Sequence, residues 1–253
     1  MSLTLFEGWG WLLACLLPFL FIQRRVHREI QAVLLLITRS PGLSVGVFSF
    51  LFFPGVFLHE LSHFIMAKIL RVRTGRFSLI PGTLPDGSLR LGFVETAQAD
   101  FLRDALIGAA PLIAGGLVTA WIGIGKLGAA ELIAPLADGN VAAFFILLSK
   151  LPQHPDFWLW FYLAFTISST MLPSPSDRKG WAPVIIVILV LVGILLLAGA
   201  GTWLLENAAP RLNEALKSIA MVFGISLGMH LMLLIPLWLL RKLISKITGL
   251  KVE

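Results

Sequence analysis

The sequence predicts an all-α membrane protein, a polytopic bundle of about six transmembrane helices with a small membrane-associated β-hairpin after the second. Two observations predict this class. Of the 253 residues, 57% are hydrophobic and 13% are charged, and the mean hydropathy is +0.89, whereas about a quarter of the residues in a soluble domain are charged. In addition, six segments approach the roughly 20 apolar residues with which a helix crosses the hydrocarbon core.

The first predicted span lacks a basic n-region and a small-residue cleavage site, so we expect a retained helix and not a signal peptide. Residues 29–38 are apolar enough to form a separate short helix in the membrane interface, and residues 123–140 read as a loop. The six predicted spans cover residues 5–22, 43–67, 104–124, 157–172, 181–205 and 219–240.

Six crossings place both termini on one side of the membrane. With this arrangement, twelve Lys and Arg residues lie on the side of the termini and eight on the other, and the positive-inside bias assigns the richer side to the cytoplasm. We therefore expect a multi-pass protein of the cell membrane with cytoplasmic termini. The cluster of Arg24, Arg25 and Arg28 on the opposite side argues against this orientation.

The charges and the cysteine content restrict the partners. The net charge of +6 does not indicate nucleic acid, because the basic residues flank apolar segments and form no long basic tract. The expected partner is the lipid bilayer. The single cysteine, Cys15, excludes an intramolecular disulfide, and any metal ion must be bound by His, Asp or Glu.

Residues 74–96 contain two apolar runs separated by Pro85, Asp86 and Gly87. This pattern predicts a hairpin at the cytoplasmic boundary. Two roles remain open for it. The hairpin either packs on the bundle or offers one of its strands, in segment 77–80 or 89–94, as an edge to which an extended peptide can add.

Residues 59–63 read His-Glu-Leu-Ser-His, an H-E-x-x-H pattern inside the second predicted span. Side chains at positions i and i+4 lie on one face of a helix, so His59 and His63 can bind one zinc ion. Glu60 projects about 100° around the helix from His59, where its carboxylate can act as a general base. Each ionisable side chain at mid-helix in lipid costs about 2.5–3.5 kcal/mol, so three within five residues indicate a shared functional site.

A catalytic zinc ion usually has three protein ligands, and two histidines leave one to be found. Asp177 is the preferred third ligand, because Pro173 and Pro175 end the fourth predicted span just before it and leave irregular backbone at membrane depth. Glu95 is the runner-up. His154 lies in a loop on the opposite side, and His230 lies within the sixth predicted span, where it either supports the ligands or packs in the bundle.

Together these motifs resemble the site-2 protease family of intramembrane zinc metalloproteases. The resemblance covers residues 57–181 and includes the H-E-x-x-H helix, a Gly-Ala-Ala-Pro-Leu stretch at 108–112 and a proline-rich stretch that ends at Asp177. It implies that His59, His63 and Asp177 bind one Zn²⁺ per chain and that Glu60 is the catalytic base. It also implies a metalloprotease core at residues 43–180, between an N-terminal part (1–42) and a C-terminal part (181–253).

The sequence departs from the family pattern in three places. Thr170 stands where the family has an asparagine, the stretch from Pro173 to Asp177 is one residue shorter, and Arg178 and Lys179 follow the aspartate. The resemblance implies an endopeptidase that cleaves peptide bonds in the transmembrane segments of other proteins. Two alternatives stay open: a non-enzymatic metal-binding or metal-transporting membrane protein, and a protease homologue that no longer cleaves.

Overall fold

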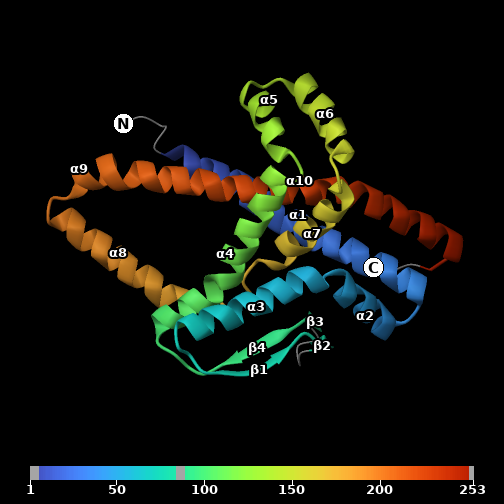
Figure 1. Ribbon diagram of the computed structural model, residues 1–253, viewed down its shortest axis with the longest axis horizontal. Helices are drawn as coiled ribbons and strands as arrows, with labels where there is room; N and C mark the ends of the chain where they lie inside the picture. The colour runs from blue at the N-terminus through green and yellow to red at the C-terminus, as the bar shows by residue number, and fades with distance from the viewer. Residues whose placement is uncertain (1–5, 84–88, 251–253) are drawn as a thin grey trace.

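The computed structural model describes residues 6–83 and 89–250. The described chain is mostly helical with a small antiparallel β-hairpin (Figure 1), which confirms the predicted class in its broad form. Two of the described helical segments are long and apolar enough to cross a membrane, Phe101–Gly125 and Gly201–Thr248. A bent pair of helices, Pro41–Leu51 and Phe53–Ile69, passes the same test when it is taken as one segment.

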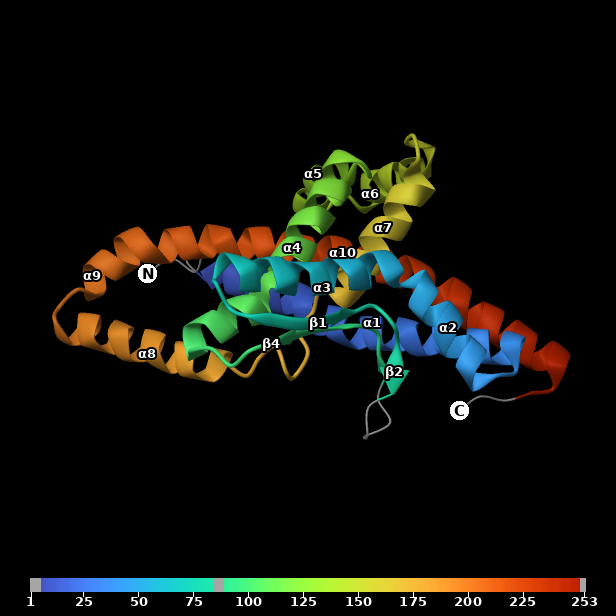
Figure 2. The ribbon, with the colours of Figure 1, turned by 60° about the horizontal axis from the view of Figure 1, so that its bottom comes forward.

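The longest helices, α1 (Glu7–Thr38) and α10 (Ala209–Thr248), lie side by side along most of their length (Figures 1 and 2). They are parallel, because the Gly8 N–H donates to Asn213 near the start of both helices and Glu29 pairs with Arg241 near the end of both. The predicted interfacial helix at 29–38 is wrong, since these residues continue α1 without a break.

The parallel pair bears on the expected position of the termini. If α1 and α10 both cross the bilayer, the start of α1 and the end of α10 lie at opposite ends of the pair, as the ribbons of the two helices in Figure 1 show. Hydropathy locates apolar segments but does not give the direction in which each one runs.

That bend divides the second predicted span into α2 (Pro41–Leu51) and α3 (Phe53–Ile69), which meet at an angle of 67°. Pro54 occupies the first turn of α3, where its missing N–H breaks no helical hydrogen bond but prevents α2 from continuing through it. The break directs α3, with the H-E-x-x-H residues, along the β-hairpin, on the lower side of the molecule in Figure 1.

Helices α4 (Phe101–Gly125) and α7 (Phe157–Thr170) pack against α3 and against α10. A cluster of buried apolar side chains joins them, including Ile122, Phe161 and Met229. Residues 129–137, predicted as loop, instead form the short helices η2 (Ala129–Leu132) and α5 (Ile133–Ala137). The remaining helical elements are α6 (Val141–Lys150), η3 (Leu151–Gln153), α8 (Trp181–Leu197), α9 (Gly201–Trp203) and the π-helical turn η4 (Leu204–Ala208).

The predicted hairpin is confirmed with its bounds. Strand β1 (Thr74–Ser78) pairs antiparallel with β4 (Phe93–Thr96), and β2 (Gly82–Thr83) pairs with β3 (Leu89–Arg90). The predicted turn at Pro85, Asp86 and Gly87 lies outside the described residues. The hairpin follows α3 directly and lies along it (Figure 1), so a strand is placed beside the helix that bears the histidines.

Candidate metal centre

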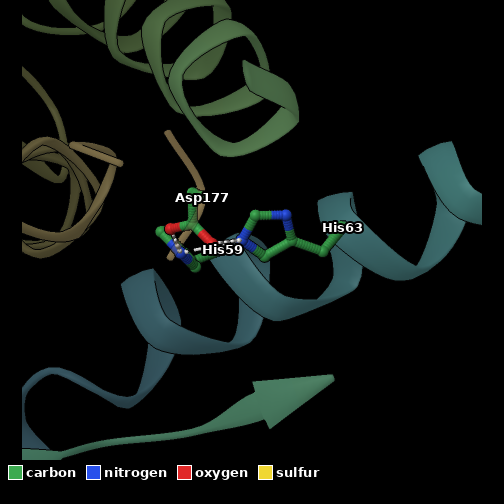
Figure 3. Close-up of side chains that lie close together, drawn as sticks. All are labelled: His59, His63 and Asp177. Atoms are coloured by element: carbon green, nitrogen blue, oxygen red, sulfur yellow. Dashed lines mark hydrogen bonds and ion pairs between the residues drawn. The ribbon is translucent and has the colours of Figure 1, made fainter. Parts of the chain in front are cut away.

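Helix α3 presents His59 and His63 one turn apart, and the loop that follows α7 brings Asp177 against them (Figure 3). The two Nε2 atoms are 3.2 Å apart. The Asp177 carboxylate oxygens lie 3.4 Å from His63 Nε2 and 3.8 Å from His59 Nε2. One ligand atom from each residue therefore lies within 4.8 Å of the others, and the three side chains form a group that could hold a metal ion.

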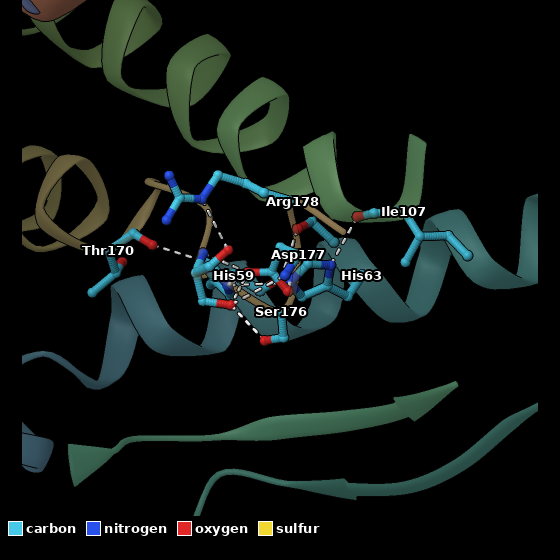
Figure 4. Close-up of polar contacts among 9 residues, drawn as sticks. His59, His63, Ile107, Thr170, Ser176, Asp177 and Arg178 are labelled. Carbon is cyan, nitrogen blue, oxygen red and sulfur yellow. Dashed lines mark hydrogen bonds and ion pairs between the residues drawn. The ribbon is translucent and has the colours of Figure 1, made fainter. Parts of the chain in front are cut away.

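Each histidine uses its other ring nitrogen in a hydrogen bond to the backbone of a neighbouring helix. His59 Nδ1 donates to the Thr170 carbonyl of α7 at 2.6 Å, and His63 Nδ1 donates to the Ile107 carbonyl of α4 at 2.8 Å (Figure 4). Because a carbonyl oxygen can only accept, the proton of each neutral ring is on Nδ1. Each Nε2 then presents a lone pair, as in histidines that bind metals.

Two nitrogen lone pairs and a carboxylate thus converge on one point. A proton could bridge only one of these pairs of acceptors, whereas a metal ion can bind all three at once. In a tetrahedral zinc site with Zn–N distances of about 2.0–2.1 Å, neighbouring ligand atoms lie about 3.3–3.4 Å apart. The separations of 3.2 Å between the histidines and 3.4 Å from His63 to Asp177 fit such a site, whereas the 3.8 Å from His59 to the other carboxylate oxygen of Asp177 is longer than this spacing.

Asp177 is fixed by the turn that precedes it. Its Oδ2 atom accepts hydrogen bonds from the backbone N–H of Ser174, at 2.7 Å, and from the Ser174 hydroxyl, at 2.6 Å. Burial alone would raise the pKa of the Asp177 carboxyl, but the two hydrogen bonds from Ser174 act against burial, and the pKa lies below its usual value. The ionised carboxylate that these bonds favour is the form that binds a metal ion.

Two adjacent residues of α4, Ile107 and Gly108, position His63 and Asp177. The Ile107 carbonyl orients His63, and the backbone of Asp177 packs directly against Gly108. A Cβ atom at Gly108 would overlap the Asp177 carbonyl oxygen, so this close approach requires glycine.

Thr170, which stands where the resemblance implies an asparagine, acts here through its main chain. Its carbonyl accepts from His59, and its hydroxyl donates within α7 to the Thr166 carbonyl at 3.0 Å. The position therefore orients a histidine and does not offer a side-chain amide.

The three residues lie in the wall of a cavity of ≈ 1030 Å³, and Glu60, which is only 8% exposed, lines the same cavity. The backbone of Gly92 lies against Glu60, since a Cβ atom at Gly92 would be 3.0 Å from Glu60 Cγ. Of the two edge segments left open by the sequence, residues 90–94 line the cavity, while residues 77–80 of the described chain do not.

Two of the other predicted candidates lie apart from this group. Glu95 belongs to β4, and its Oε2 atom accepts from the backbone N–H of Arg76 at 3.1 Å. His154 lies between η3 and α7, where its Nε2 atom is 3.9 Å from a carboxylate oxygen of Glu131. Neither is brought to the histidines of α3.

His230 is fully buried in α10, and both of its ring nitrogens are hydrogen-bonded. Its Nδ1 donates to the Ser226 carbonyl at 2.7 Å, so its Nε2 accepts from the Ser169 hydroxyl at 2.9 Å. Ser169 is the neighbour of Thr170 in the last turn of α7. The ring also packs against Phe19 and Phe165, so the contacts of His230 fit both roles that the sequence left open, packing in the bundle and support of the helix end that orients His59.

Sequence reasoning missed three polar residues of α1, Gln23, His27 and Gln31, that line the same cavity. The sequence contains a pattern that could have identified these residues. The three recur at four-residue spacing, which places them on one face of a helix.

Neither a scan against known protein families nor searches of curated proteins and of solved structures found a match for this chain. Its function has to be inferred from the site itself.

Proposed function

We propose that this chain is a zinc endopeptidase of the site-2 protease type, which hydrolyses peptide bonds in the transmembrane segments of other proteins. One observation carries the proposal: a two-histidine, one-aspartate group and a neighbouring glutamate line one cavity among apolar helices. Two histidine nitrogens and one carboxylate oxygen are a ligand set typical of catalytic zinc, with a fourth position left for water or substrate.

The residues of the chain have distinct roles in this reaction. His59, His63 and Asp177 hold the ion, which when bound polarises the scissile carbonyl and lowers the pKa of a water molecule. Glu60 accepts a proton from the attacking water. The same carboxyl then donates that proton to the leaving amine as the C–N bond breaks, so Glu60 ends the cycle ionised, as it began.

Apolar helices around the site support a substrate within the membrane. Helices α4 and α9–α10 meet the length and hydropathy of spans, and the apolar helix α8 buries none of its described residues in the protein. We place the protein in the cell membrane with α1, α2–α3, α4, α7, α8 and α10 as its six predicted membrane segments, of which the bent pair α2–α3 need not cross completely. A helical substrate has to unwind before attack, because its amides are hydrogen-bonded within the helix.

The decisive experiment compares the wild-type protein with Glu60→Gln in detergent, using a single-span peptide with a helix-breaking Gly-Pro pair at its centre. Wild-type protein should contain zinc and cleave the peptide, while Glu60→Gln should keep its zinc and cleave at least about 100-fold more slowly. Zinc without cleavage in the wild-type protein would indicate an inactive homologue. Equal cleavage by the two proteins would exclude the proposed role of Glu60.

A further inference from the structure

One face of α1 lines the cavity with polar side chains. Gln23, His27 and Gln31 all belong to the lining, and their spacing places them in one row along the helix. Their exposure increases along this row, from buried Gln23 through half-buried His27 to exposed Gln31. We call these three residues the polar row. The row leads from the interior of the cavity to the surface of the molecule.

The inner end of the polar row is anchored beside the metal group. Gln23 Nε2 donates to the Ser169 carbonyl at 2.5 Å. The next residue, Thr170, holds His59 through its own carbonyl. Gln23 and the proposed zinc ligand His59 are therefore hydrogen-bonded to the carbonyls of two adjacent residues at the end of α7.

His27, in the middle of the row, has a polar atom that the described chain does not satisfy. Its Nε2 is buried without a hydrogen-bond partner among the described residues. The ring packs edge-on against Phe52, with centroids 4.9 Å apart, and against Phe48, at 5.7 Å. These contacts fix the ring without satisfying the nitrogen. Buried polar atoms that lack a partner are uncommon in folded proteins, and a bound ligand is one explanation for them.

We propose that the polar row is a peptide subsite, in which Gln23, His27 and Gln31 bind the main chain of the unwound substrate. This inference rests on the proposed endopeptidase function. An extended peptide exposes N–H and C=O groups along both edges, and within a membrane each of them needs a partner. Amide and neutral imidazole side chains can both donate and accept hydrogen bonds, so the row can bind main chain of either polarity without selecting side chains.

The spacing of the row matches this ligand. Side chains four residues apart on a helix are separated by about 6.0 Å along its axis. Groups that point to the same side of an extended chain recur every second residue, or about every 6.6–6.8 Å. Three successive positions of the row can therefore follow about five residues of substrate from the metal group toward the exposed end at Gln31.

The test measures binding separately from cleavage. The probe is a fluorescein-labelled single-span peptide of leucine and alanine with a central Gly-Pro pair, and its Kd is measured by fluorescence anisotropy with full-length, zinc-loaded Glu60→Gln protein in detergent. Adding His27→Leu or Gln31→Leu should raise the Kd about five- to tenfold each, as expected for one lost hydrogen bond. His27→Gln, which retains a donor and an acceptor, should bind close to the parent.

Gln153→Leu is the matched control, because Gln153 is exposed in η3 and does not line the cavity; its Kd should not change. A photo-cross-linking residue at exposed Gln31 gives a second readout that does not depend on the stability of the His27 variants, and it should cross-link to the peptide. Unchanged Kd values for both leucine variants, or no cross-link, would overturn the subsite. The same leucine changes are also made in the active protein. If they slow cleavage there while the Kd in the Glu60→Gln protein is unchanged, the row supplies water to the site and does not bind the peptide.

The two levels of failure can be distinguished. If wild-type protein cleaves the peptide but the row variants bind it normally, only the subsite is wrong. If wild-type protein does not cleave the peptide and Glu60→Gln does not bind it, the endopeptidase function and the subsite both fail.

Discussion

His59 and His63 face each other with their Nε2 atoms 3.2 Å apart, while the Nδ1 of each ring is held by a different helix, α7 for His59 and α4 for His63. Each histidine is thus oriented by an element other than the one that carries it. Loss of such an orienting partner typically lowers metal affinity about 10- to 100-fold. The site therefore depends on the packing of three helices and not on the α3 motif alone.

The first prediction concerns the ligand set. His59→Ala, His63→Ala and Asp177→Ala should each lose most of the zinc that copurifies with the wild-type protein, because each removes one of three converging ligand atoms. Metal analysis of the purified variants by mass spectrometry measures this. Glu95→Ala and His154→Ala serve as controls and should keep their zinc. Normal zinc in Asp177→Ala combined with loss in Glu95→Ala would replace Asp177 by Glu95 as the third ligand.

The second prediction concerns the contact between α4 and the Asp177 loop. Gly108→Ala should weaken zinc binding about 10- to 100-fold, because the added methyl group overlaps the Asp177 carbonyl and must displace the loop. Competition with a zinc chelator gives the affinity. Gly116→Ala is a matched control on the same helix, since a Cβ there would lie 3.9 Å from Val222 Cγ1, at ordinary van der Waals distance. Equal affinities for the two variants would show that the loop does not depend on this contact.

The sequence could predict the metal group because local rules place each member. The i, i+4 spacing puts His59 and His63 on one face whatever the surroundings, and the prolines before Asp177 end α7 where the chain can turn back. It could not predict which carbonyls hold the rings. The contact from His59 to Thr170 and the contact from His63 to Ile107 join helices far apart in the chain, and only the tertiary packing decides them.

The arrangement of the long helices could not be predicted from the sequence for a related reason. Hydropathy identified apolar segments in α1 and α10, but it does not give the direction in which each one runs, and it does not show that the second predicted span is bent by 67° between α2 and α3. The polar row of α1 was missed because neighbouring Arg24 and Arg28 made that stretch read as a charged boundary. Only the folded chain shows that Gln23 and His27 turn toward the cavity.

The third prediction concerns the orientation of the α1–α10 pair. An ion pair between Glu7 and Lys217 lies near one end, and one between Glu29 and Arg241 lies toward the other. From residue 7 to residue 29 a helix rises about 33 Å, close to the roughly 30 Å thickness of the hydrocarbon core. We therefore expect the pair to cross the membrane between these two levels.

Basic residues from both helices gather within one helical turn of Glu29 and beyond it; they are Arg25, Arg28, Arg39, Arg241, Lys242 and Lys246. By the positive-inside rule we expect this end to be cytoplasmic. In a Cys15→Ala background, Glu214→Cys should react with a membrane-impermeant maleimide added to intact cells, and Lys246→Cys should react only after lysis. Both side chains are exposed. Labelling of the two cysteines from the same side would show that α10 does not cross in this way.

The fourth prediction concerns the edge of the hairpin beside the cavity. Among the described residues β4 pairs with β1 alone, so its other edge is open to an added strand. The Ala97 N–H donates to the Arg73 carbonyl at 2.9 Å, and the adjacent Thr96 lies opposite Thr74. Because successive residues of an antiparallel strand direct their main-chain groups to opposite edges, the N–H and C=O of Thr96 point away from β1. Thr96 also lines the cavity.

Thr96→Pro removes this outward N–H but leaves the hydrogen bond between Ala97 and Arg73 in place. The change also restricts Glu95 to extended conformations, which it already has in β4. If the substrate adds as a strand at this edge, kcat/KM for the single-span peptide should fall about five- to tenfold, as for one lost hydrogen bond, while the zinc content stays normal. Thr96→Val keeps the N–H with a side chain of similar shape and should cleave like the wild-type protein. Full activity in Thr96→Pro would leave the hairpin with a packing role only, because a substrate paired at this position would lose one main-chain hydrogen bond.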